Sequence, residues 1–212
     1  MNYCLADCYI AMHEVWVFGV LVIPVTLLFL LHFFSAQGRT CSLIREESRR
    51  MIWRKQGYKG FLFSVMMTFY FHTCIFLFGG LASKSYINWS STSSLFFYKT
   101  ECSTSMVCFP LFLAVSSAIV FLKLFMISLA AIFAVWAAKN KEIMIMFIIT
   151  LAGAELFLQE KPVRLFFNIL NASYDKWLSV WKMAESIIYG IVLCILIWYM
   201  GKSNITRKDF FL

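Results

Sequence analysis

The sequence predicts an all-α polytopic membrane protein: a bundle of five transmembrane helices, with the amino terminus outside and the carboxyl terminus in the cytoplasm. Three observations predict this class. Of the 212 residues, 61% are apolar and only 14% are charged, whereas a soluble domain carries about 25% charged residues. Long apolar segments recur along the chain, and basic residues gather between the first two. Backbone groups in lipid must be paired within the structure, so apolar segments without in–out alternation are expected to be helices.

Four segments are long and apolar enough to span a bilayer, namely residues 15–36, 60–83, 110–138 and 181–201. At about 1.5 Å per residue, each matches a hydrocarbon thickness of roughly 30 Å. A fifth segment, residues 143–158, is shorter and contains Glu155. It is a short span, a re-entrant hairpin or a helix buried among the others, and we favour a span. The chain is therefore expected to form one transmembrane domain.

Lysine and arginine set the expected orientation. Residues 1–14 contain neither, whereas the loop 37–59 contains Arg39, Arg45, Arg49, Arg50, Arg54, Lys55 and Lys59. Basic loops stay on the cytoplasmic side, so this loop is predicted to be cytoplasmic and to contact anionic lipids. Cys41 follows the first span closely and is a candidate for palmitoylation. The net charge of +8 is attributed to this orientation signal, and no nucleic-acid partner is expected.

The loop 84–109 is polar and is predicted to lie outside. Its cysteines, and two near the amino terminus, would share an oxidising compartment. These four are candidates for two disulfides, with all three pairings open: Cys4, Cys8, Cys102 and Cys108. Their spacing fits no zinc template, and neither a metal nor a cofactor is expected.

Glycosylation sequons bear on the number of crossings. Asn88 lies outside with either four or five spans, Asn171 only with five, and Asn204 only with four. Asn204 is too close to the last span to be a good acceptor, which favours five spans. Asn88 and Asn171 are therefore the candidate glycosylation sites. The expected location is a membrane of the secretory pathway, either the plasma membrane or the endoplasmic reticulum.

The ionisable residues inside the predicted spans include Lys123, Glu155, His72 and Glu185. Burying a charge in the bilayer costs about 2.5–3.5 kcal/mol even on insertion scales, so a role is expected for each. One interpretation is a salt bridge between Lys123 and Glu155 that fixes helix packing. A second is a hydrated path, and a third is a carboxylate of a partner protein that meets Lys123.

The chain contains no hydrolase elbow, zinc-protease motif or phosphate-binding loop. We therefore expect a non-enzymatic membrane protein that acts through association, as an auxiliary or structural subunit of a larger membrane assembly. The alternative is a small ion channel or transporter with a polar path that includes Lys123, Glu155 and His72.

Overall fold

The computed structural model describes residues 2–35, 49–105, 107–138, 146, 149–150, 153–154 and 170–207. Across these residues the chain is helical and contains no β-strand, which confirms the all-helical class. Three segments are long and apolar enough to cross a membrane: Arg50–Ala82, Phe109–Ala134 and Val180–Asn204. A bent pair, Leu5–His13 with Phe18–Leu30, makes a fourth if it counts as one span. The predicted span at 143–158 lies mostly outside the described residues.

The amino-terminal span is broken into several helical pieces. Helix α1 (Leu5–His13) is followed by α2 (Val15–Val17), the π-helical turn η1 (Phe18–Val22) and α3 (Ile23–Ser35). Glu14 separates α1 from α2 with non-helical backbone angles, φ −56° and ψ 137°. The helical segments Leu5–His13 and Phe18–Leu30 are bent by 67° relative to each other. Helical backbone therefore covers residues 15–35 of the first predicted span, and residues 5–13, which precede that span, form a further helix.

Helix α5 (Arg49–Ala82) is 34 residues long and corrects the predicted boundary of the second span. The pattern of the loop predicts a separate amphipathic helix over residues 41–58 that Gly57 could end, yet residues 49–59 and the second span form one continuous helix. Gly57 lies inside α5, and the indole ring of Trp198 packs against it. Residues 36–48 of the predicted loop, with Cys41, lie outside the described residues.

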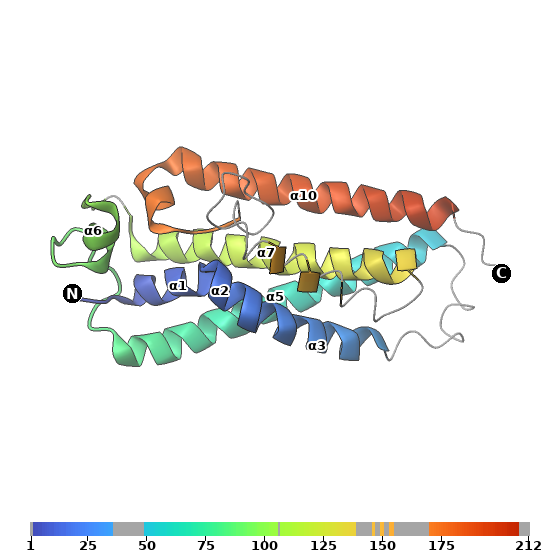
Figure 1. Cartoon of the computed structure of the whole chain (residues 1–212), viewed down its shortest axis with the longest axis horizontal. Helices are drawn as coiled ribbons and strands as arrows, with labels where there is room; N and C mark the ends of the chain where they lie inside the picture. Colours follow the sequence, from blue (N-terminus) through green and yellow to red (C-terminus); the bar gives the residue numbers. More distant parts are fainter. Residues whose placement is uncertain are drawn as a thin grey trace.

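The remaining elements are α6 (Leu95–Thr100), α7 (Phe109–Ala138), the 3-10 helix η2 (Tyr174–Leu178) and α10 (Val180–Arg207). Helices α7 and α10 run in the same direction (Figure 1). Midway along the pair, Sγ of Cys194 donates to the carbonyl of Leu122 at 3.9 Å, and Gly190 faces the Leu122 side chain. Just before α10, Trp177 of η2 contacts Phe112 near the start of α7. Helix α5 runs opposite to both.

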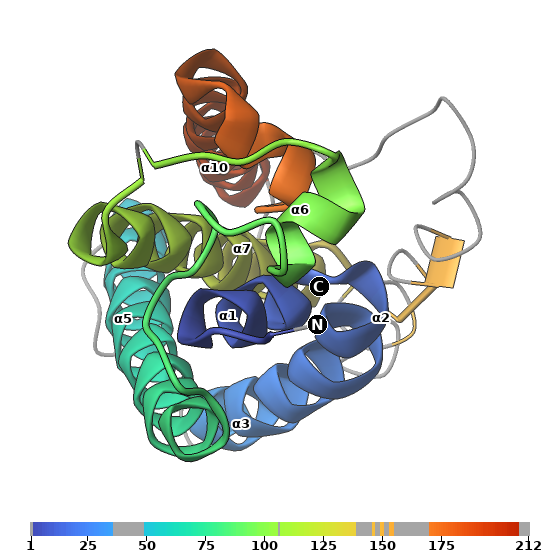
Figure 2. The same cartoon turned by 90° about the vertical axis from the view of Figure 1, so that its left-hand side faces the viewer.

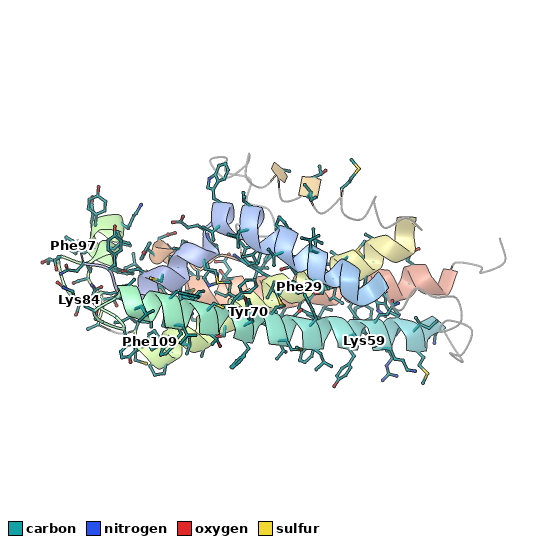
Figure 3. All side chains as sticks on the ribbon, turned by 90° about the horizontal axis from the view of Figure 1, so that it is seen from below. Phe29, Lys59, Tyr70, Lys84, Phe97 and Phe109 are labelled. Carbon is teal, nitrogen blue, oxygen red and sulfur yellow. The ribbon has the colours of Figure 1, made fainter. Side chains whose placement is uncertain are left out.

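The two ends of the bundle differ in content. Lys84, Phe97 and Phe109 lie at one end, and Lys59 lies toward the other (Figure 3). The amino terminus and α6 share the first of these ends (Figure 1), which we call the α6 end. Seen from there, α1 lies centrally among α3, α5 and α7 (Figure 2). Helix α7 supplies much of the core, with fully buried Ile119, Val120 and Leu124.

Candidate functional site

The candidate site lies around α1, where buried polar side chains form hydrogen bonds between distant segments. Its first component is the carboxylate of Asp7. One carboxylate oxygen accepts a hydrogen bond from the backbone N–H of Cys4 at 3.0 Å. The other accepts from Nε1 of Trp89 at 3.1 Å and from the hydroxyl of Tyr174 at 3.3 Å. Only 3% of Asp7 is exposed. A single buried side chain thus ties α1 to the loop after α5 and to the segment before α10.

Backbone hydrogen bonds complete this attachment. The first N–H groups of a helix have no partner within it. In α1 the N–H of Leu5 donates to the carbonyl of Ser85 at 2.9 Å, and that of Ala6 donates to Tyr86 at 3.1 Å. The loop after α5 therefore acts as the cap of α1.

An aromatic shell encloses the same contacts. Trp89 stacks on Phe96 at 4.6 Å and meets Phe112 edge-on at 5.5 Å, and Phe112 in turn contacts Trp177 at 4.7 Å. Burial, followed by the charge of Asp7, raises the pKa of Tyr174. Its hydroxyl therefore remains protonated and available as a donor. We call Asp7, Trp89, Phe96, Tyr174 and Trp177 the outer clasp.

The second component is the break between α1 and α2, where Lys123 of α7 is buried with 1% exposure. Its Nζ donates to the carbonyl of His13 at 3.5 Å and lies 4.4 Å from the centre of the Phe18 ring. The carboxyl end of a helix carries partial negative charge, and the face of an aromatic ring attracts cations. The break therefore supplies two favourable contacts for Lys123, whose charge is costly to bury in an apolar segment.

His13 and Ser116 lie beside Lys123. Nε2 of His13 and Oγ of Ser116 share a hydrogen bond of 2.9 Å, and both residues are at most 1% exposed. A serine–histidine pair is one element of a nucleophilic site, but such a site also needs a group that orients the histidine. Among the described residues, Nδ1 of His13 has no hydrogen-bond partner. The pair joins α1 to α7.

The third component is His72 of α5, which is 9% exposed. Its Nδ1 donates to the carbonyl of Thr68 at 3.0 Å, because a carbonyl can only accept. Nε2 of the neutral ring is then an acceptor, and within the described part of the chain it has no partner. The hydroxyl of Tyr9 donates to the His72 carbonyl at 3.0 Å, and the two rings lie 5.2 Å apart. Leaving a buried acceptor unpaired costs about 1–3 kcal/mol.

The predicted intramembrane residues do not all meet. Lys123 and His72 approach opposite ends of one turn of α1, at His13 and Tyr9 respectively. Glu185 instead lies on the exposed side of α10, away from both. Glu155 lies outside the described residues, so its proposed bridge to Lys123 does as well.

The candidate modification sites have these surroundings. The four predicted disulfide partners are free thiols, with Cys4 buried, Cys8 half-buried, and Cys102 and Cys108 exposed. The structure thus does not support the predicted disulfides. The amide nitrogen of Asn88 donates to the carbonyl of Asn2 at 2.9 Å, and Asn171 is half-buried. Glycosylation of either residue stays a prediction.

Most residues of this site, Asp7 and His13 among them, were not predicted from the sequence as site residues. Asp7 is a lone acid among the first residues and has no nearby basic partner in the sequence, so nothing local distinguishes it. His13 precedes Glu14 in a polar pair at the edge of an apolar segment, and that pair was the available signal for a helix break. Among the described residues, no group of three or more His, Cys, Asp or Glu side chains is arranged to hold a metal ion.

The fold and site define an all-helical chain with three candidate membrane spans and a broken amino-terminal helix clasped at one end. No family model, curated protein or solved structure matches this chain.

Proposed function

We propose that this chain is a non-enzymatic multi-pass membrane protein that acts through association, as an auxiliary subunit of a larger membrane assembly. The observation that carries the proposal is the exposed face of α10. Ile188, Val192, Ile195 and Tyr199 are each 47–63% exposed along one side of this helix. Packing against α7 occupies its other side, so this face is free to meet lipid or another helix.

Glu185 supports a contact between this face and another protein helix, in addition to lipid. It is exposed at the start of the same stripe, five residues into α10, or about 7–8 Å along the helix axis. A carboxylate that faces lipid near a membrane boundary is costly, although it becomes favourable when another helix offers a cation or a donor. The expected partner is a transmembrane helix with a basic or hydroxyl side chain at that depth.

The topology that we propose has five crossings, with the α6 end outside. Helix α7 ends at Ala138 at the far end of the bundle, whereas η2 contacts the outer clasp at the α6 end. The end of α7 and the start of η2 thus lie at opposite ends of the bundle, which supports a crossing between α7 and α10. The basic residues at the start of α5 lie at the far end, which supports a cytoplasmic assignment for that end.

Photocrosslinking tests the proposed association. A photoreactive amino acid is placed at Ile188 or Val192 on the α10 stripe, and at Phe69 or Leu77 on the exposed face of α5 as matched controls. In native membranes we expect the α10 positions to form a discrete protein adduct that the α5 positions do not form. Glu185→Ala should reduce the yield of that adduct. Lipid adducts alone at all four positions would exclude this interface.

One observation favours the alternative function, which is the conduction of an ion or small solute. The broken span brings His13, Ser116 and Lys123 together inside the bundle, and discontinuous helices form the binding sites of many transporters. Reconstitution in liposomes separates the two functions, with Lys123→Met and His72→Phe as the variants. Ion or solute flux that both substitutions abolish would favour conduction over association.

A further inference from the structure

The far end of the bundle, opposite the α6 end, carries a basic surface formed by α5 and α10 (Figure 1). Its three exposed cations are Arg50, Arg54 and Lys202. Trp53 packs over Gly201, and each immediately precedes one of these cations, so the basic surface draws on neighbouring parts of the two helices. Residues 49–59 and 201–207 contain no acidic residue. No carboxylate of these segments therefore neutralises the basic surface.

Two tyrosines mark the boundary between the basic surface and the lipid-facing part of the bundle. Gly57 contacts the indole ring of Trp198, so the next residues, Tyr58 and Tyr199, lie within about 3 Å of each other along the bundle axis. Both are 63% exposed, and tyrosine is enriched where hydrocarbon meets headgroups. From Tyr58 to the exposed Leu81, α5 runs about 34 Å. A tilted helix of that length crosses roughly 30 Å of hydrocarbon.

The three cations lie beyond this boundary at two depths. Arg54 is four residues past Tyr58, or about 6 Å along the axis, and Arg50 is about 12 Å past it. Lys202 follows Tyr199 by three residues on α10, or about 4–5 Å. The headgroup layer on each side of a bilayer is about 5–8 Å thick. Arg54 and Lys202 therefore lie within this layer, whereas the continuous helix α5 holds Arg50 beyond it.

We propose that the basic surface binds the headgroup of a phosphoinositide, a lipid that carries phosphates at both depths. Its phosphodiester lies in the headgroup layer, near Arg54 and Lys202. The phosphate monoesters of its inositol ring project into water, toward Arg50. Guanidinium groups bind such phosphates through paired hydrogen bonds. A phosphatidylserine headgroup has only the phosphodiester and would leave Arg50 without a phosphate.

The side of the membrane agrees with this ligand. Basic residues directly beside a transmembrane helix in the cytoplasm are a common signature of phosphoinositide binding. The topology that we propose turns the far end to the cytoplasm, and the lipid proposal rests on that topology in cells. It does not rest on the association through α10, because the exposed α10 stripe and the basic surface are different parts of the molecule.

Native mass spectrometry of the full-length chain in detergent micelles tests the ligand without regard to membrane side. Short-chain phosphatidylinositol 4,5-bisphosphate is compared with phosphatidylinositol and phosphatidylserine of the same acyl length. We expect the bisphosphate to bind at least about tenfold more tightly than either, because only its monoesters reach Arg50. Soluble inositol trisphosphate at equal concentration should not displace it. Equal binding of the three lipids, or displacement by the soluble phosphate, would overturn the proposal.

Two double variants separate the basic surface from the overall charge. Arg50→Gln with Arg54→Gln should weaken binding of the bisphosphate about tenfold and leave that of phosphatidylinositol nearly unchanged. Glutamine favours helix about as well as arginine does, so α5 is retained. Lys84→Gln with Lys99→Gln removes two exposed lysines at the α6 end and should preserve the preference for the bisphosphate. An equal loss in both double variants would overturn the proposal, because binding would then follow net charge alone.

Discussion

At the scale of single residues, the molecule depends on polar side chains that are buried and paired across long sequence separations. Asp7 joins Trp89 across 82 positions and Tyr174 across 167 positions. A buried carboxylate is tolerated only when its oxygens accept hydrogen bonds. Asp7 receives three of them, and it is therefore a fastening point rather than a surface charge.

Removing this carboxylate should loosen the α6 end. Asp7→Ala leaves the donors of Cys4, Trp89 and Tyr174 without their acceptor, so we expect a loss of about 2–4 kcal/mol. Thermal unfolding in detergent, monitored by tryptophan fluorescence, measures the effect. Asp175→Ala is the matched control, because Asp175 is an exposed acid close to the same clasp. Equal stability of the two variants would contradict the role of Asp7.

Thiol reactivity should follow the same burial pattern. Cys4 is fully buried, and burial together with the nearby Asp7 raises the pKa of its thiol to about 12. Maleimides react with the thiolate, so a chain with Cys4 as its sole cysteine should resist labelling at pH 7.5 until it is unfolded. A chain that retains only the exposed Cys102 should label at once. Rapid labelling of native Cys4 would show that α1 is not held in place.

The sequence revealed some of these residues and not others, for a physical reason. Lys123 stands out because a charge in a long apolar segment violates the composition of its surroundings. The partners that accommodate it, the carbonyl of His13 and the ring of Phe18, depend on a bend that no residue type uniquely encodes. Asp7 is ordinary in its local context, and its importance arises only when three distant segments meet.

At the scale of elements, the docking of α1 on α5 depends on one small residue. A methyl group at Gly79 would lie 2.8 Å from Cδ1 of Leu5 and 3.2 Å from Cβ of Cys8. The adjacent Gly80 has nothing within 4 Å. Gly79 therefore packs against α1, whereas the neighbouring Gly80 does not.

This difference gives a matched pair of substitutions. Gly80→Ala should be neutral or stabilising by up to about 1 kcal/mol, because alanine favours helix. Gly79→Ala should offset that gain through overpacking, which typically costs about 1–3 kcal/mol. The comparison of the two melting temperatures is the measurement. Identical melting temperatures would mean that α1 does not pack on α5 as described.

The opposite end of the bundle has a reciprocal arrangement. Trp53 of α5 packs over Gly201 of α10, and Trp198 of α10 packs over Gly57 of α5. The two indole rings are 5.5 Å apart. Gly201→Ala should lower stability by about 1–3 kcal/mol through overlap with the Trp53 ring. Near-ultraviolet circular dichroism checks it, because the tryptophan signal should weaken in Gly201→Ala and persist in Gly80→Ala.

The long helices were largely predictable, whereas their ends were not. Hydropathy located the spans at 60–83, 110–138 and 181–201, and the structure has helices over all three. Helix α5 nevertheless begins at Arg49, because basic residues favour helix as readily as apolar ones do. Helix α1 was missed because its residues are too few and too mixed to look like a span, and because its burial depends on the loop that caps it.

At the scale of the whole molecule, the parallel arrangement of α7 and α10 is the feature with the largest consequence. It places η2 at the α6 end, where the amino terminus also lies, and it underlies the five crossings that we propose. The Asn171 sequon, which precedes η2, and the Asn88 sequon then face the same side. This account joins the outer clasp, the topology and the exposed face of α10 in one arrangement.

The most direct test of this topology is the side of the membrane on which η2 lies. Asp175→Cys and Lys202→Cys are introduced singly into a chain whose accessible cysteines are replaced by serine. Intact cells are then treated with a membrane-impermeant maleimide. The account predicts labelling of Asp175→Cys from outside, and labelling of Lys202→Cys only after permeabilisation. Labelling of Lys202→Cys from outside, with Asp175→Cys labelled only after permeabilisation, would place η2 in the cytoplasm and contradict the five-crossing topology.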